Sequence, residues 1–186
     1  PMKLAVLLGG KVPGKIGNLV NKAFGNNCYE KSISILKGLL TNILNPYESI
    51  PVDFHLSFEQ TYGIVEGDSA SVAEIICILS ALSKKGIKQN IAVTGSINQF
   101  GEVQPIGGVN DKIEGFFKVC SILESFEGKG VLIPEANKDE IILKSEVEEA
   151  IINGKFCVYT MNNLNDAIEK ILDGQAVLFA GAGFSY

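Results

Sequence analysis

Apolar residues recur with two different periods along this chain, and the two periods predict a mixture of strands and helices. Residues 3–10 read KLAVLLGG, an apolar run ending in two glycines, which predicts a buried strand. Residues 52–60 alternate between apolar and polar side chains, which predicts a half-buried strand. Further short strands are predicted at 91–96, near 102–104, and at 131–134 and 156–160.

Other segments repeat their apolar residues every three or four positions, which predicts helices. These segments are 29–44, 70–83, 110–120 and 165–172, with a shorter helix at 138–143. The 70–83 segment is the most apolar, so we expect it to be central and to end at Gly86. Residues 11–27 are dotted with glycine and are predicted to be irregular. Because helices and strands interleave, the fold class is α/β or α+β.

The composition is that of one globular domain without an obvious nucleic-acid partner. Its 186 residues are 46% hydrophobic, which is enough for a core. The net charge of −5 and the absence of a lysine or arginine cluster argue against nucleic acid. No apolar run reaches the roughly 18 to 20 residues of a membrane span. Four cysteines occur singly, which argues against zinc and disulfides and favours a cytoplasmic location; they are Cys28, Cys77, Cys120 and Cys157.

The single histidine leaves few familiar catalytic arrangements. His55 lies in the alternating 52–60 segment and is interpreted as a partly exposed structural residue, so a serine hydrolase built on this chain would need a lysine base. Lys112 follows the Gly107-Gly108 turn and falls in the first turn of a predicted helix, among apolar neighbours. The helix dipole and burial there both lower a lysine pKa. An ordinary exposed lysine remains the alternative at this stage.

The matching nucleophile candidate is Ser69, in the GDSAS stretch at 67–71. Ser71 and Glu74 fit the S-x-x-E capping box, so Ser71 is the predicted helix cap. Ser69 is then not needed as a cap, which favours a role as the nucleophile. Backbone N–H groups of residues 68–70 would form an oxyanion hole at the positive end of the helix.

Three motifs in order resemble the proteolytic domain of Lon proteases, in its archaeal-type branch. They are GDSAS at 67–71, TGSI at 94–97 and QPIGGVNDKIE at 104–114, and VLIPEAN at 131–137 is also similar. The resemblance spans roughly residues 29–172 and implies a compact α+β domain, with mixed sheets and packed helices, over residues 1–175.

The same resemblance implies a serine endopeptidase that acts on unfolded proteins or peptides through a Ser-Lys dyad and an acyl-enzyme. Ser69 would be the nucleophile, Lys112 the general base 43 residues later, and Thr94 a residue that orients the lysine. It also implies a hexameric ring. The alternative is a catalytically silent Lon-like module for interaction or regulation.

The sequence departs from the common Lon pattern around the serine. Asp68 precedes Ser69 directly, and Glu66 stands where the archaeal-type branch has an acidic residue that can approach the lysine. A carboxylate there would favour the charged amine and oppose a lowered pKa. Glu66 is therefore predicted to modulate activity or to hold a resting state. Residues 11–27 are shorter than the corresponding archaeal-type segment, which leaves substrate specificity open.

No G-x-x-x-x-G-K-[ST] phosphate loop occurs, so no cofactor is predicted for this chain, and ATP would serve only a separate ATPase module of the parent protein. Residues 176–186, AVLFAGAGFSY, are predicted to be a C-terminal tail or the start of another domain. They resemble the first strand and loop of Sir2-type NAD-binding domains, but NAD is not predicted here.

Overall fold

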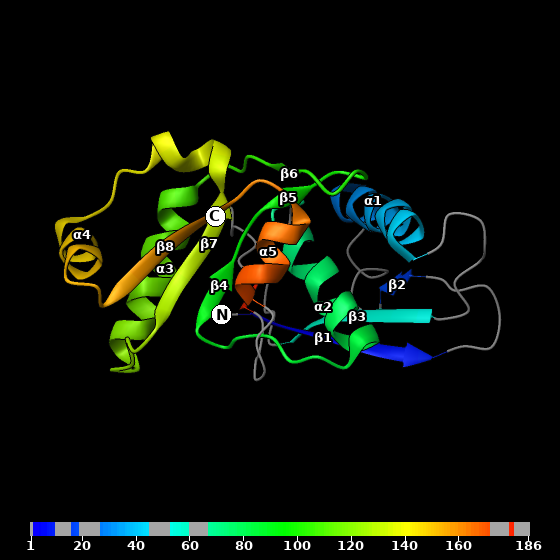
Figure 1. Cartoon of the computed structure of the whole chain (residues 1–186), viewed down its shortest axis with the longest axis horizontal. Helices are drawn as coiled ribbons and strands as arrows, with labels where there is room; N and C mark the ends of the chain where they lie inside the picture. Colours follow the sequence, from blue (N-terminus) through cyan, green and yellow to red (C-terminus); the bar gives the residue numbers. More distant parts are fainter. Residues whose placement is uncertain are drawn as a thin grey trace.

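The computed structural model describes residues 2–9, 16–18, 27–44, 53–59, 67–171 and 179–180 (Figure 1). The helices are α1 (Asn27–Leu44), α2 (Ser71–Ser83), α3 (Val109–Ile122), the 3-10 helix η2 (Glu135–Glu140), α4 (Ser145–Ile152) and α5 (Leu164–Ile171). The strands are β1 (Met2–Gly9), β2 (Ile16–Asn18), β3 (Asp53–Glu59), β4 (Ile91–Val93), β5 (Ser96–Ile97), β6 (Val103–Gln104), β7 (Lys129–Pro134), β8 (Phe156–Met161) and β9 (Phe179–Ala180).

Among the described residues the strands form one mixed sheet and one small ribbon. The sheet has seven strands in the order β2-β3-β1-β9-β4-β7-β8, and β5 pairs with β6 in a separate antiparallel ribbon. β1 and β3 are antiparallel, whereas β4, β7 and β8 are parallel. This mixture, together with helices packed on both faces, confirms the predicted α+β class.

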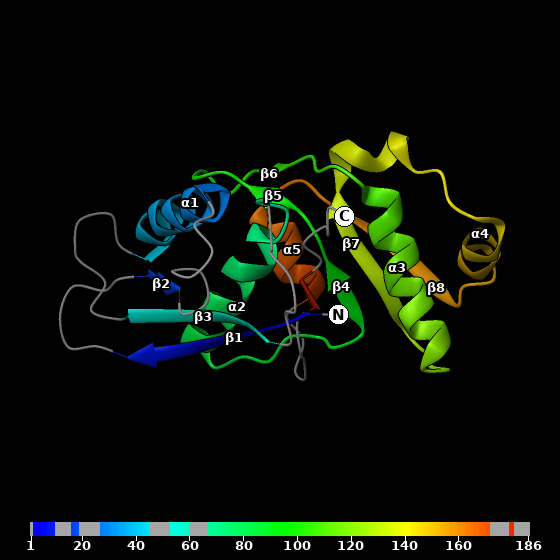
Figure 2. The ribbon, with the colours of Figure 1, turned by 180° about the vertical axis from the view of Figure 1, so that it is seen from behind.

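Alternating side chains of the parallel strands divide the interior into two cores. On β7, Leu132 belongs to the core built with α1, α2 and α5, whereas Val131 and Ile133 belong to the core built with α3 and α4. Successive strand residues point to opposite faces, so one short apolar strand serves both cores. Figures 1 and 2 show α5 on one face of this part of the sheet and α3 on the other.

The apolar helix predicted at 70–83 is α2, and it is central. Every residue from Ser71 to Ile78 is buried, as expected for a helix that is apolar on all sides. Its predicted end at Gly86 is wrong, because Lys84 already adopts the left-handed conformation at φ 54° and closes the helix.

Strand β3 confirms the alternating pattern at 52–60. Phe54 and Leu56 are buried, and the backbone of His55 pairs with Leu7 of β1 and Gly17 of β2. The prediction that residues 11–27 are irregular is wrong in part, because β2 runs parallel to β3 within that segment. Residues 10–15 and 19–26 lie outside the described residues.

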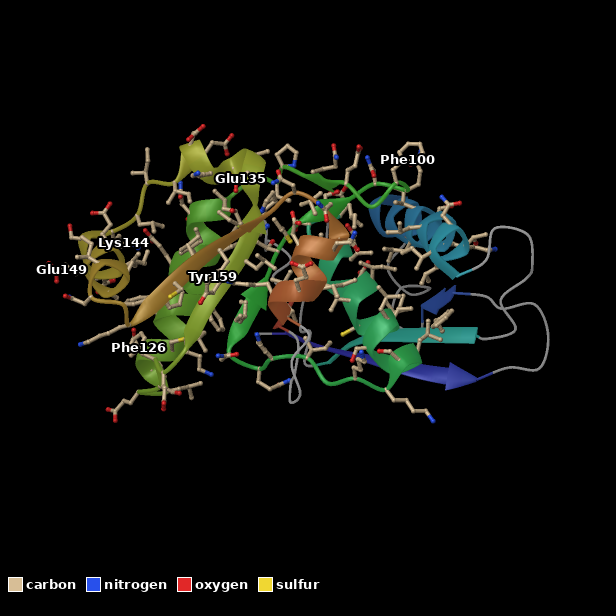
Figure 3. The ribbon with its side chains drawn as sticks, viewed as in Figure 1. Phe100, Phe126, Glu135, Lys144, Glu149 and Tyr159 are labelled. Carbon is tan, nitrogen blue, oxygen red and sulfur yellow. The ribbon has the colours of Figure 1, made fainter. Side chains whose placement is uncertain are left out.

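The helix predicted at 138–143 is wrong in part. Its first three residues belong to η2 over 135–140, residues 141–144 have no regular secondary structure, and the next helix is α4. Helix α4 was not predicted, because it buries only Val147 and Ala150 and so carries little apolar periodicity. Figure 3 shows α4, with Lys144 and Glu149 labelled, far from Phe100, which lies near α1.

The short strand β9 lies between β1 and β4 in the sheet, antiparallel to the first and parallel to the second. The predicted division between residues 1–175 and 176–186 stays a prediction.

Candidate active site

The fold brings Ser69 and Lys112 into direct contact. The Lys112 Nζ donates a hydrogen bond of 3.1 Å to the Ser69 Oγ. Ser69 lies in the turn before α2 and is only 9% exposed, and Lys112 lies in the first turn of α3. The two residues that the sequence singled out therefore form one site, built at the N-terminal ends of two helices.

The start of α3 explains why the lysine side chain reaches back toward the serine. Gly108 precedes the helix with a φ of 66°, a conformation that favours glycine, and its carbonyl accepts the Lys112 N–H at 3.2 Å. Helical side chains lean toward the N-terminus of their helix. The Lys112 Nζ accordingly also donates to the carbonyl of Gly107 at 3.3 Å.

The environment of Lys112 shifts the pKa of its amine below the ordinary value. Burial lowers the pKa of the amine, while the carboxylates of Asp111 and Asp68 raise it and so oppose that effect in part. The net direction is downward, as the sequence predicted for this lysine. A lowered pKa increases the fraction of amine that can accept a proton at neutral pH.

The backbone of Ser69 is held by the segment that follows β4. The Ser69 carbonyl accepts hydrogen bonds from the Gly95 N–H at 2.8 Å and from the Thr94 hydroxyl at 3.3 Å. Thr94 was predicted to orient the lysine. The contact described here holds the serine instead, and a role of Thr94 toward Lys112 stays a prediction.

The predicted capping box at the start of α2 is wrong. Ala70 is the residue before the helix, and no side chain caps it. The Ser71 hydroxyl instead accepts a 2.9 Å hydrogen bond from the buried N–H of Ile97 in β5. The first N–H groups of α2 find backbone partners, since Ser71 donates to the Asp68 carbonyl and Val72 to the Gly95 carbonyl. An oxyanion hole at residues 68–70 stays a prediction.

Of the two acidic residues predicted to act at the site, Asp68 and Glu66, the structure describes Asp68. Asp68 accepts a 2.8 Å hydrogen bond from the hydroxyl of Ser96, which is buried, and its charge acts on Lys112. Glu66 lies outside the described residues, so its approach to the lysine stays a prediction.

Sequence reasoning missed Ser96, the carbonyl of Gly107 and the buried Asn137. All three lie inside motifs that were recognised as wholes, at 94–97, 104–114 and 131–137. Asn137 is the third residue after the apolar strand β7, and its 1% exposure could not be read from its position.

In chemical terms, a lysine amine of lowered pKa in contact with a serine hydroxyl is a general base beside a nucleophile. This is the arrangement of Ser-Lys hydrolytic sites. Within the described ranges, no three His, Cys, Asp or Glu side chains gather as a metal-ligand set. In the same ranges no helix has the length and apolar character needed to cross a membrane.

Comparison with known proteins gives the family. The sequence model of the Lon protease (S16) C-terminal proteolytic domain matches residues 17–174. The chain therefore belongs to the family of Lon proteolytic domains, as its motifs indicated.

Full-length relatives agree with this assignment. The chain is 40% identical over 161 residues to the "Putative Lon protease homolog" of Escherichia coli (strain K12), an overlap of 86% of this chain and 28% of that protein. It is 36% identical over 122 residues to the "Archaeal Lon protease" of Archaeoglobus fulgidus, an overlap of 66% of this chain and 18% of that protein. It is 33% identical over 161 residues to the "Archaeal Lon protease" of Thermococcus kodakarensis, an overlap of 87% of this chain and 22% of that protein. The chain thus spans less than a third of these relatives.

Proposed function

We propose that this domain is a serine endopeptidase with a Ser69-Lys112 dyad. The observation that carries the proposal is the 3.1 Å contact between the Lys112 Nζ and the Ser69 Oγ. This distance lies within the range at which a base takes a proton from a nucleophile. Family membership and the lowered pKa of Lys112 support the same chemistry.

The reaction would have two halves. The Ser69 Oγ attacks the scissile carbonyl carbon while its proton passes to the neutral Lys112 Nζ. The peptide C–N bond then breaks, and the lysine ammonium gives the proton to the leaving amine, which leaves an ester on Ser69. Lys112 next takes a proton from water as the water oxygen attacks the ester carbonyl carbon. The bond between that carbon and the Ser69 Oγ then breaks, the peptide leaves as a carboxylic acid, and the proton returns from Lys112 to the Ser69 Oγ. No cofactor enters these steps.

Substrate and assembly are also proposals. Unfolded polypeptides or peptides as substrates and a hexameric ring follow from the family, the singly occurring cysteines favour a cytoplasmic location, and ATP would serve only a separate ATPase module. The assembly is tested by light scattering after size-exclusion chromatography. A mass near six times 19.9 kDa supports the ring, and a monomer at micromolar concentration contradicts it for this chain.

Hydrolysis of a fluorogenic peptide or of casein tests the activity. Wild type should cleave, whereas Ser69→Ala and Lys112→Ala should lose cleavage by at least about 1000-fold, as expected for members of a catalytic unit. Lys118→Ala is the matched control, because this exposed lysine lies on the same helix and should leave cleavage unchanged. Equal cleavage by wild type and Ser69→Ala contradicts the proposal. A folded wild type that cleaves nothing favours the silent interaction module.

A further inference from the structure

We propose that Asn137 is a positioning residue that fixes the Lys112 amine through the turn at Ile106 and Gly107. The inference rests on the proposed function, because it concerns the base of that reaction. Asn137 does not touch the dyad, so it is distinct from a catalytic residue.

Asn137 is anchored to a single backbone position from both sides. Its Oδ1 accepts the Ile106 N–H at 3.0 Å, and its Nδ2 donates to the Ile106 carbonyl at 2.9 Å. The second Nδ2 hydrogen bond goes to the Glu140 carboxylate at 2.9 Å. Because Asn137 is 1% exposed, breaking this pairing would leave buried polar groups without partners. The orientation of Ile106 is therefore tightly determined.

The residue after Ile106 supplies the second hydrogen bond of the lysine. The Gly107 carbonyl accepts from the Lys112 Nζ at 3.3 Å. Gly107 and Gly108 have no side chains to pack, and a Cβ placed on Gly107 would have no neighbouring heavy atom within 4 Å. Side-chain packing at Gly107 therefore does not hold this turn, whose position depends on the anchored Ile106 before it and on the start of α3 after it.

The Gly107 carbonyl matters because a neutral amine has few groups that can form hydrogen bonds. A neutral lysine amine carries two N–H bonds and one lone pair. When one N–H is held by the Gly107 carbonyl, the lone pair can be directed at the Ser69 hydroxyl proton. After proton transfer the same carbonyl still accepts a hydrogen bond from the ammonium, so the group need not move between steps.

The fold places the anchor beside the base. Figure 2 shows η2, which carries Asn137, next to the first turn of α3, and Glu135 in Figure 3 marks where η2 begins at the end of β7. Asn110, in the first turn of α3, also joins this turn to the end of η2. Its side chain donates to the Glu140 carbonyl at 3.1 Å and accepts the Ile142 N–H at 3.0 Å.

The variants Asn137→Ala and Asn137→Asp test the inference. Both lose the donor to the Ile106 carbonyl, and the aspartate keeps the volume. We expect kcat for peptide cleavage to fall by about 30- to 100-fold with KM within about twofold, since a small misplacement of a reacting group has this effect. Asn90→Ala is the control, because it removes an asparagine hydrogen bond of 2.7 Å to Gly128, which contacts neither member of the dyad. It should lower the melting temperature and leave kcat unchanged.

The pH profile separates positioning from a merely structural role. In a folded Asn137 variant the loosened amine becomes more hydrated, and the carboxylates of Asp111 on its own helix and Asp68 before α2 still favour its charged form. The acid limb of kcat/KM should therefore move to higher pH. Folded variants with wild-type kcat and an unmoved acid limb overturn the inference.

If the Asn137 variants fail to fold, a measurement on the wild type still tests the inference. The Ile106 amide should exchange with solvent at least about 100-fold more slowly than in an unfolded chain, because its acceptor is buried. Exchange at the unfolded rate overturns the inference. Absence of Ser69-dependent cleavage in wild type is a different result, because it overturns the proposed function while the exchange rate still reports on the anchor.

Discussion

The N–H of Gly95 donates a 2.8 Å hydrogen bond to the carbonyl of Ser69, and the Gly95 carbonyl accepts from the Val72 N–H at 3.2 Å. One residue thus holds both the turn that carries the serine and the first turn of α2. A side chain at this position has little room, because a Cβ on Gly95 would lie 2.8 Å from the Met161 Cε and 3.0 Å from the Val72 Cγ2.

Gly95→Ala should therefore destabilise the domain and disturb the serine. We expect a loss of about 1 to 3 kcal/mol, typical of overpacking a core, measured by denaturant unfolding. The value of kcat should fall at the same time. Gly115→Ala is the control, since a Cβ there meets nothing within 4 Å and a helical alanine should stabilise by about 0.5 to 1 kcal/mol. Equal effects of the two changes would contradict this account.

Ser71→Ala tests the corrected role of that serine. The change leaves the buried Ile97 N–H without an acceptor, so we expect a loss of about 1 to 3 kcal/mol in the free energy of unfolding. Ser121→Ala, at an exposed residue, removes a part-buried hydroxyl that donates to the Phe117 carbonyl within α3, and should change stability by less than about 0.5 kcal/mol. If the two variants unfold alike, the hydroxyl of Ser71 is not an essential acceptor.

The charge beside Lys112 should set the acid limb of the pH profile. Because the neutral amine is the active form, kcat/KM rises with pH as Lys112 loses its proton. Asp111 raises the pKa of this amine, so Asp111→Asn should move the acid limb to lower pH. The exposed Glu127→Gln, beyond the end of α3, should leave it in place. An acid limb that moves to higher pH in Asp111→Asn is the opposite of what the electrostatics require.

The same lowered pKa predicts how stability depends on pH. The folded state releases the Lys112 proton below the ordinary value of 10.5, so between the lowered pKa and 10.5 the unfolded chain binds more protons. Wild type should therefore gain stability relative to Lys112→Met as the pH rises through that window, and the difference should be constant below it. Thermal unfolding at a series of pH values measures this, and a difference that grows in favour of Lys112→Met would contradict the lowered pKa.

Periodicity predicted the parts of this fold that bury regular apolar faces. The alternation around Phe54 and Leu56 predicted β3, and the apolar run from Val72 to Ile78 predicted α2 as a central helix. The contact between Ser69 and Lys112 was reached through motifs and their resemblance to a family, because spacing alone does not show that two helix starts meet.

What the sequence could not predict depends on contacts between distant segments. Ser71 looks like a local cap, but a strand 26 residues later uses its hydroxyl. Asn137 is a polar residue in a recognised motif, and nothing local shows that it is buried against a turn 31 residues earlier. In both cases a buried backbone group without a partner costs more than a local hydrogen bond gains, so the tertiary contact prevails.

The central claim, that Lys112 activates Ser69 for acyl transfer, is tested most directly by trapping the acyl-enzyme. The domain is mixed with an activated peptide ester, quenched in acid within milliseconds to seconds, and analysed by mass spectrometry of its fragments. We predict that the acyl mass appears on the Ser69 side chain in wild type, is absent in Ser69→Ala, and forms at least about 1000-fold more slowly in Lys112→Ala. Acyl transfer at the wild-type rate in Lys112→Ala, or an acyl group on another residue during cleavage, would contradict the claim.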